Sequence, residues 1–335
     1  MKKFIAEILA IVLAAGALVA LLDARRVFAQ EEGNNHTGKR WYYLYKYGKQ
    51  KKNAIDVLVL GNSHAYTGLL PEILSEQLGR RCFILASQGN RITDSYYMLE
   101  EALTVCKPKL LVIETYTIRD YQQRKMSGID LSCQFQSFEN RRNTWLKLKS
   151  TPMLFSADNA PYAWSQTLRN HSYLFDNPAL VSYNLKHPDA PVYKDKDYLG
   201  RFVRFTSGLE EPVLERYRKE GPPEDGAQLT VGADARKSVA KILHLCRKKG
   251  IRVMFLTIPM YHGHIAHPEA LHANLAPVIG DAPWLDLQDP AYNDLFGPDC
   301  FENTYNRNQH QTSTGAYKTS LLLARFIKMN PSLQL

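Results

Sequence analysis

Hydrophobic and polar positions follow two alternating patterns along most of the chain. Short apolar runs rich in β-branched residues precede longer segments whose apolar residues recur at helical spacing. The first pattern is typical of buried strands and the second of amphipathic helices. Strands are predicted at residues 55–60, 81–86, 109–114, 251–258 and 284–287. Because helical patterns separate these strands, we expect an α/β fold with a parallel, doubly wound sheet.

The helical patterns have recognisable ends. Pro71 begins one segment and Gly79 ends it, which fits the preference of proline for the first turn and of glycine for the position after the last turn. The predicted helices of the sheet domain cover residues 71–79, 93–106, 233–249, 268–279 and 313–327.

The regular pattern is interrupted between residues 117 and 232. This stretch is rich in tyrosine, asparagine, proline and charge, and it predicts a mainly helical insertion, with helices such as 138–148 and 162–168. An insertion of this length shapes a binding groove or a lid, or it forms a structural subdomain without ligand contacts. Both interpretations stay open.

The amino-terminal segment is the most apolar part of the chain. Residues 4–22 are broken only by Glu7, and about 19 residues suffice to span a bilayer. A cleaved signal peptide is one interpretation, because residues 27–29 have the small-x-small form that precedes a cleavage site. We favour an uncleaved anchor, since the run is longer than a usual signal core and Arg25 and Arg26 separate it from that site.

These features predict three parts. Residues 1–26 are a membrane anchor or signal segment, residues 27–53 a linker, and residues 54–330 the α/β domain with its insertion at about 117–232. The aromatic patch at residues 41–45 lies at the membrane interface or packs on the domain. We expect a single-pass protein of the cell membrane with the main domain extracytoplasmic, although basic residues on both sides of the apolar run leave the orientation undecided.

The composition limits the classes of partner that we expect for this chain. The formal charge of +9 comes partly from basic clusters near the amino terminus, which suit membrane flanks better than a nucleic-acid surface. No segment reproduces a nucleic-acid-binding pattern, and we expect no nucleic-acid partner. The five cysteines form no CxxC pair, and their odd number leaves at least one thiol unpaired. One bridge among Cys133, Cys246 and Cys300 stays open.

Three predicted turns carry candidate chemistry. They are residues 61–64 after the first strand, residues 86–90 after the second, and residues 306–316 before the last helix. Ligands of open α/β sheets bind at the carboxyl edge of the strands, and we expect all three turns to meet there.

Acyl transfer needs a nucleophile, a base within hydrogen-bond reach and donors for the oxyanion. Ser63 is the candidate nucleophile and His310 the candidate base. The N–H groups of Gly89 and Ser63 are candidate oxyanion donors, with Asn62 beside them. The alternative for Ser63 is an ordinary turn serine that caps the next helix.

Three further residues of these turns are candidates for substrate contact: His64, Gln88 and Asn90. The alternative for His64 is a structural histidine that holds the turn. The loop histidines His262, His264 and His267 have only Glu269 nearby as an acidic partner, and no Walker or GxGxxG sequence follows the first strand. We expect neither a metal nor another cofactor.

The three turns together resemble the blocks of the SGNH (GDSL-like) hydrolase superfamily, in particular its membrane-anchored branch with a Gly-x-Ser-His block. Residues 61–64 are similar to the first block, residues 86–89 to the block with the oxyanion glycine, and His310 with Gly315-Ala316 to the terminal block. The resemblance covers about residues 55–114 and 233–326. It implies a flavodoxin-like three-layer α/β/α parallel sheet.

Two positions depart from the family pattern. Arg307 stands three residues before His310, where the family usually has an aspartate, and residues 114–116 lack the asparagine usual after the third strand. Asn306 is our candidate to orient His310, and Asp286, Asp289 or a Ser–His dyad are alternatives.

Relatives in this branch act in teichoic-acid D-alanylation and polysaccharide O-acetylation. The resemblance therefore implies a serine esterase or O-acyltransferase acting on an acylated cell-envelope polysaccharide or a small ester, beside a multispanning membrane acyltransferase. The rival interpretation is a catalytically inactive protein of the same fold that binds glycan or scaffolds an envelope acylation complex.

Overall fold

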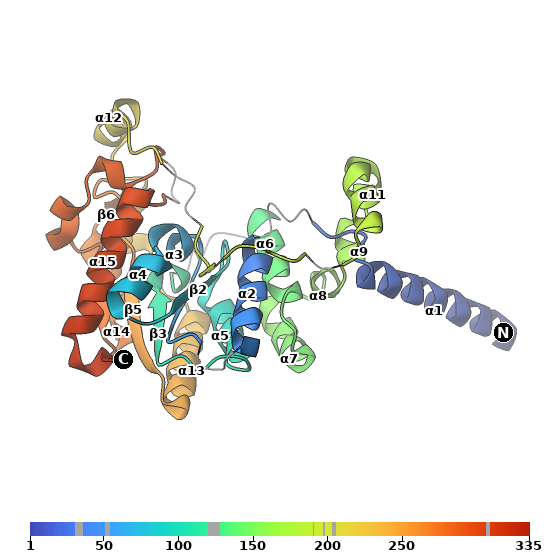
Figure 1. Cartoon of the computed structure of the whole chain (residues 1–335). Helices are drawn as coiled ribbons and strands as arrows, with labels where there is room; N and C mark the ends of the chain where they lie inside the picture. Colours follow the sequence, from blue (N-terminus) through green and yellow to red (C-terminus); the bar gives the residue numbers. More distant parts are fainter. Residues whose placement is uncertain are drawn as a thin grey trace. The chain divides into compact units, whose positions relative to one another are not determined.

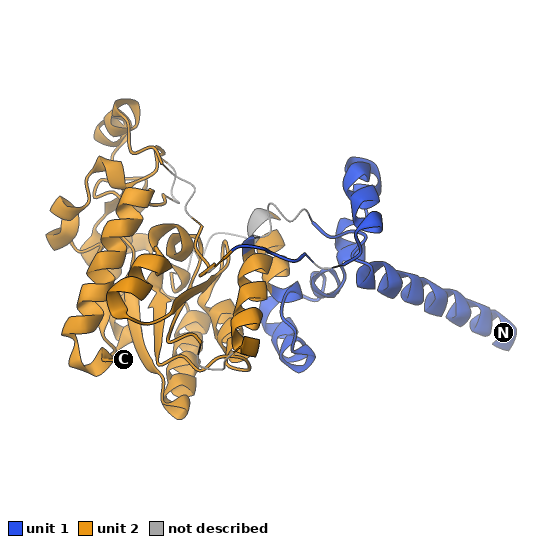
Figure 2. Cartoon of the chain, viewed as in Figure 1, with its two compact units in different colours: residues 1–36, 138–195 blue, residues 37–137, 196–335 orange. Residues whose placement is uncertain are grey.

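The computed structural model describes residues 1–30, 36–50, 54–119, 128–189, 191–196, 198–202, 206–305 and 309–335. These residues form two compact units, coloured separately in Figure 2. Unit 1 comprises residues 1–36 and 138–195, and unit 2 comprises residues 37–137 and 196–335. The middle of the predicted insertion therefore groups with the amino-terminal segment, whereas its two ends belong to the unit that holds the sheet.

A five-stranded parallel sheet forms the centre of unit 2 (Figure 1). Its strand order is β2-β1-β3-β5-β7. The strands are β1 (Val57–Gly61), β2 (Cys82–Ala86), β3 (Leu110–Glu114), β5 (Arg252–Thr257) and β7 (Trp284–Asp286). Every residue of β1, β2 and β3 is buried, as expected for parallel strands covered on both faces. The prediction of an α/β fold with a parallel sheet is confirmed.

Helices cover the sheet in groups. Helix α4 packs against α15, and α5 packs against α13. The helices of this part of unit 2 are α3 (Ser63–Gly68), α4 (Pro71–Leu78), α5 (Ile92–Ala102), α13 (Ala233–Lys249), α14 (Pro268–Ile279) and α15 (Ser313–Met329). Helix α4 begins at Pro71 and ends before Gly79, whose left-handed φ of 59° suits glycine.

Shorter elements complete unit 2. Strand β4 (Glu224–Asp225) pairs with β6 (Ile265–Ala266) in a separate two-stranded sheet. Helix α12 (Glu211–Glu220) precedes β4. The 3-10 helices are η2 (Thr115–Thr117), η3 (Gly226–Gln228), η4 (Pro290–Leu295), η5 (Pro298–Cys300) and η6 (Pro331–Leu333).

The aromatic patch at residues 41–45 packs inside unit 2. It lies on helix α2 (His36–Gln50), and the side chains of Trp41, Tyr43 and Leu44 are at most 1% exposed. The hydroxyl of Tyr45 donates a 2.6 Å hydrogen bond to Oε1 of Glu101. Of the two alternatives for this patch, the structure supports packing on the domain.

The regular secondary structure in the described residues of unit 1 is helical. Helix α1 (Lys2–Ala24) is long and apolar enough to cross a membrane, and none of its residues is buried. The other helices of unit 1 are α7 (Thr144–Leu154), α8 (Ala160–Trp164), α9 (Gln166–Asn170), α10 (Tyr173–Asp176) and α11 (Pro178–Lys186). Helix α6 (Gly128–Glu139) crosses the boundary between the units.

Two predicted helices of the insertion were wrong in extent. The segment 138–148 is broken, because α6 ends at Glu139 and the side chain of Asn143 caps a new helix by accepting the N–H of Leu146. The segment 162–168 is divided at Ser165, whose extended backbone ends α8 and whose hydroxyl accepts the N–H of Leu168 at the start of α9.

The cysteines form no bridge. All five are free, and Cys82, Cys106, Cys246 and Cys300 are buried in unit 2. Burial raises the pKa of the Cys106 and Cys246 thiols to about 12, so these side chains act as small apolar core residues.

Candidate active site

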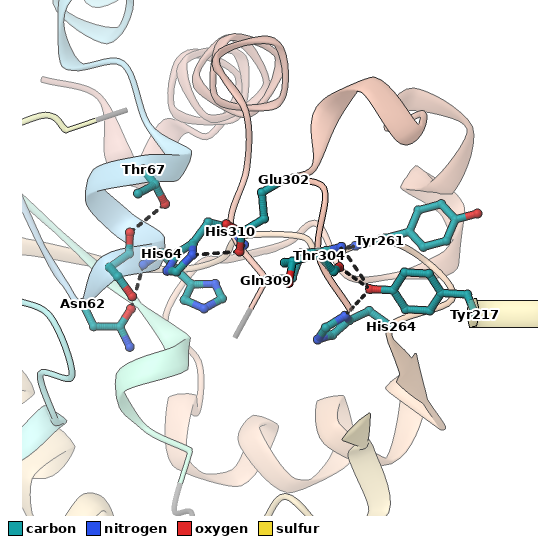
Figure 3. A network of polar contacts seen from close by, with 11 residues as sticks. Asn62, His64, Thr67, Tyr217, Tyr261, His264, Glu302, Thr304, Gln309 and His310 are labelled. Atoms are coloured by element: carbon teal, nitrogen blue, oxygen red, sulfur yellow. Dashed lines mark hydrogen bonds and ion pairs between the residues drawn. The ribbon is translucent and has the colours of Figure 1, made fainter. Parts of the chain in front are cut away.

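The turn after β1 carries Ser63 at the carboxyl edge of the sheet. Ser63 is the first residue of α3, and the cap of this helix is Asn62, whose Oδ1 accepts the N–H of His64 at 3.0 Å. Ser63 is therefore not the cap that its alternative interpretation required. Its carbonyl accepts a 2.7 Å hydrogen bond from the Thr67 hydroxyl (Figure 3).

Gly61 makes this turn sterically possible. A Cβ atom at this position would lie 2.3 Å from Cβ of Ala65 and 3.0 Å from Cβ of Glu114. Only a glycine allows α3 to fold back so closely onto the end of β1. The result is a tightly held Ser63, only 6% exposed, next to His64, which is 2% exposed.

The turn after β2 is tied to the same strand end. The amide nitrogen of Asn90 donates to the carbonyl of Gly61 at 3.0 Å and to the hydroxyl of Ser95 at 2.8 Å. Both N–H groups of this side chain are thus engaged within the fold, so Asn90 holds the turn. Gln88, by contrast, is exposed.

Gly89, the candidate oxyanion donor, lies in the turn after β2. Its φ of 62° lies in the left-handed region that favours glycine. Among the hydrogen bonds of the described residues outside helices and strands, none uses the Gly89 N–H. The turn thus presents a backbone donor two residues beyond Ser87, whose N–H bonds to Gly61.

His310 has an acidic partner that the sequence did not reveal. Phe301 and Gln311 form an antiparallel bridge, which brings Glu302 beside His310. Oε1 of Glu302 lies 3.1 Å from Nδ1 of His310 and accepts the backbone N–H of His310 at 2.8 Å. The two side chains are 11% and 13% exposed. This pair has the connectivity of an acid that orients a general base.

His310 also lies beside the serine turn. The ring centroids of His64 and His310 are 5.1 Å apart, and the labelled side chains of both face one another in Figure 3. The first and last predicted turns therefore meet at one edge of the sheet, and His310 neighbours the residue that follows Ser63.

A stack of side chains also contacts His64. The ring of Tyr116, just after β3, lies 3.9 Å from the His64 ring in a stacked geometry. The guanidinium of Arg119 lies 4.6 Å from the centroid of the Tyr116 ring. Arg119 in turn forms a buried ion pair with Glu224. The end of β3 thus holds His64 through an aromatic contact with Tyr116.

Glu114 is buried at the same edge. Its Oε1 accepts the N–H of Tyr116 at 2.7 Å and so caps η2. Burial raises the pKa of Glu114 from 4.5 to about 8, although this hydrogen bond and the Arg119 charge act in the opposite direction. A carboxyl group that is largely protonated at neutral pH therefore lies against the glycine of the serine turn.

A second network holds Gln309, the residue before His310. The Tyr217 hydroxyl lies 2.8 Å from Nδ1 of His264 and accepts a 3.1 Å hydrogen bond from the amide of Gln309. Oε1 of Gln309 accepts the N–H of Tyr261 at 2.8 Å (Figure 3). Because Gln309 is adjacent to His310, this network fixes the position from which the histidine side chain projects.

The start of α15 is held equally closely. A Cβ atom at Gly315 would lie 2.3 Å from the carbonyl oxygen of Cys300, and the hydroxyl of Thr312 accepts the N–H of Gly315. Gly315 is therefore required by packing at the start of α15.

Two other candidates for orienting His310, Asp286 and Asp289, make their contacts elsewhere. Asn306 falls outside the described residues. Asp286 lies 2.9 Å from Nδ1 of His272, and Asp289 caps η4 by accepting the N–H of Ala291. Glu302 was missed because no local pattern links it to a histidine eight positions later; an antiparallel bridge between two irregular segments creates the contact.

The loop histidines have separate protein partners. Nδ1 of His264 faces Tyr217, and Nδ1 of His267 lies 3.0 Å from Oδ1 of Asp225. In the part of the chain that the structure describes, no three His, Cys, Asp or Glu side chains cluster as metal ligands do.

Comparison with known proteins identifies no family for this chain. No protein-family model matches the chain, and no curated protein sequence is significantly similar to it.

Proposed function

We propose that the chain is a membrane-anchored serine esterase or O-acyltransferase in which Ser63, His310 and Glu302 form the catalytic triad. The hydrogen bond between Glu302 and the His310 ring is the observation that carries this proposal. Glu302 supplies the orienting carboxylate that is absent at position 307, where an arginine stands. Its partner His310 lies beside the turn that carries Ser63.

The proposed mechanism follows acyl transfer. Nε2 of His310 removes the proton of the Ser63 hydroxyl as Oγ attacks the carbonyl carbon of an ester. The Gly89 and Ser63 N–H groups receive the oxyanion, and Glu302 stabilises the imidazolium. His310 then returns the proton to the leaving alcohol, and an acyl-Ser63 remains. A sugar hydroxyl or water, deprotonated by His310, takes the acyl group and regenerates Ser63.

Fold and sequence together support the SGNH family for this proposal. Numbered within the main sheet alone, the strand order is 2-1-3-4-5, which is the flavodoxin-like order of doubly wound sheets. Residues 61–64, 86–89 and 310–316 resemble the family blocks, and their turns converge on the same sheet edge. On this resemblance we propose an extracytoplasmic domain and an acylated cell-envelope polysaccharide as substrate.

The low exposure of the site favours one rival function. Ser63 and His64 are 6% and 2% exposed, which suits a protein of this fold that does no chemistry and scaffolds a multispanning acyltransferase. The two functions differ in whether Ser63 ever becomes acylated.

Measurement of the intact mass of the protein distinguishes the acyl-enzyme from the scaffold. The full chain, purified in detergent, is incubated with a fluorophosphonate and, separately, with an activated acetyl ester. We expect one adduct per chain, absent in Ser63→Ala and strongly reduced in His310→Ala. Ser332→Ala and His272→Ala are matched controls, since Ser332 is exposed and His272 pairs with Asp286 away from the serine turn.

Each outcome has one meaning. An adduct that depends on Ser63 and His310 supports the acyl-enzyme. The absence of an adduct with both reagents, from protein with unchanged thermal unfolding, excludes Ser63 as a nucleophile and favours the scaffold.

A further inference from the structure

Exposed apolar side chains concentrate in unit 1. Within residues 138–195, the second segment of unit 1, eleven large hydrophobic side chains are exposed in the described residues, against three in those of the much larger unit 2. Monomeric soluble proteins rarely expose so much apolar surface on so small a unit, and such surfaces mark contact with a protein or a membrane.

This surface adjoins the end of α1. Oδ1 of Asp23 accepts hydrogen bonds from the N–H and the hydroxyl of Thr167, so α9 is fixed to the last turn of α1. Leu22 and Tyr173 pack against a small core of Val27, Phe28 and Val181, which adds α10 and α11. Within unit 1, Figure 1 draws α9 and α11 beside this end of α1.

The dimensions of a bilayer then indicate which layer of the membrane α9–α11 would contact. If α1 spans the hydrocarbon, its apolar run ends at Leu22 and Asp23 begins the headgroup layer, which is roughly 5–8 Å thick. A helix with its side chains is about 10 Å across, so helices packed at Asp23 extend into that layer.

The side chains of α10 suit this position. Tyr173 packs against the core of Val27, Phe28 and Val181, whereas the next two residues, Leu174 and Phe175, are 53% and 80% exposed. Arg25 and Lys186 are exposed on the adjoining segments and suit anionic headgroups.

We infer that α9–α11 form a membrane-surface platform whose Leu174 and Phe175 insert at the boundary between headgroups and acyl chains. The occupant of this apolar surface is the lipid bilayer itself. The inference rests on the proposed membrane span of α1 and is independent of any chemistry at Ser63.

Quenching by brominated lipid tests the platform. The full chain carrying Phe175→Trp is reconstituted without other proteins into nanodiscs of phosphatidylcholine and phosphatidylglycerol, with the phosphatidylcholine either unlabelled or brominated near the headgroup end of its acyl chains. Wild-type protein supplies the background of the native tryptophans. Met329→Trp is the matched control, because Met329 is 68% exposed on α15 of unit 2.

We expect brominated lipid to quench the emission that F175W adds over wild type and to leave the emission added by M329W unchanged. Unquenched emission from F175W, in protein that enters the nanodiscs and unfolds at the wild-type temperature, overturns the platform and assigns the surface to a protein partner. Failure of the wild-type chain to enter nanodiscs overturns the membrane span, and the platform with it. Neither result bears on acylation of Ser63.

Discussion

Two glutamates at the carboxyl edge of the sheet differ in their environment. Glu302 accepts two hydrogen bonds from His310, one from the ring and one from the backbone. Glu114 is fully enclosed and accepts one hydrogen bond at Oε1, and burial raises its pKa to about 8. The first arrangement suits a residue that orients a base, and the second suits a neutral carboxyl that packs against the serine turn.

Replacing Glu302 with glutamine should lower ester turnover by about 10²- to 10⁴-fold, because the amide no longer stabilises the imidazolium or selects the productive His310 tautomer. The measurement is the rate of activated-ester hydrolysis by the full chain. We expect the loss to appear mainly in kcat.

Asp286→Asn is the control for this change. Asp286 forms the same kind of contact with His272, but at another part of the fold. Equal losses in both variants would mean that a carboxylate–histidine contact stabilises the fold generally, and Glu302 would lose its assigned role.

Glu114 should make stability depend on pH. Its folded pKa of about 8 exceeds its ordinary value of 4.5, so the folded protein retains a proton that the unfolded chain releases between these values. The free energy of unfolding should therefore fall as pH rises through this window. Glu114→Gln should flatten that part of the profile, measured as the denaturant midpoint at several pH values.

The exposed Glu211 provides the comparison. Glu211→Gln should leave the slope of the wild-type profile intact. If the profiles of wild type and E114Q run parallel throughout the window, Glu114 does not hold its proton in the folded state.

Among the elements, the connection from β1 to α3 is tightly constrained. It must reverse direction within Gly61 and Asn62, place Ser63 in the first turn of α3, and leave room for Ala65 against the strand end. The tight contact at Gly61 follows from this geometry.

Gly61→Ala should destabilise unit 2 by about 1–3 kcal/mol, since the new methyl group overlaps Ala65 and moves the serine turn away from the sheet. Thermal unfolding and ester turnover should both decrease. Gly128→Ala, at a position with open space around it, should change neither. Wild-type stability in Gly61→Ala would show that the turn relaxes without cost.

At the scale of the whole molecule, residues 27–29 are part of a folded unit. Val27, Phe28 and Ala29 are buried, and the amide of Asn184 donates hydrogen bonds to the carbonyls of Val27 and Ala29. Asn170 donates to the carbonyl of Phe28. Cleavage after Ala29 would remove this segment from the core of unit 1.

We therefore expect the chain to remain joined across Ala29 and Gln30 in the membrane-bound protein. Tryptic digestion of protein extracted from membranes should yield the peptide from Val27 to Lys39. Recovery of a peptide that begins at Gln30 in its place would establish cleavage and contradict the role of residues 27–29 in unit 1.

Much of the fold could be predicted because its signals are local. The apolar runs of β1, β2 and β3, the proline and glycine that bound α4, and the apolar length of α1 each act over a few neighbouring residues. Ser63 and Gly89 could be selected as candidates for the same reason, since a strand followed by a glycine turn is a local pattern. The helices of the insertion were harder, because polar side chains such as Asn143 and Ser165 decide where they break.

The sequence by itself determined the parallel α/β sheet, the apolar amino-terminal segment and the serine and histidine candidates. Only the tertiary structure decided that Glu302 pairs with His310, that Tyr116 supports His64, and that residues 27–29 are enclosed by the insertion. The physical reason is the distance along the chain over which each interaction acts. Hydrophobic periodicity and turn chemistry act between neighbours in the chain, whereas a hydrogen bond between two irregular segments, or the burial of residues 27–29, exists only after distant segments have packed together.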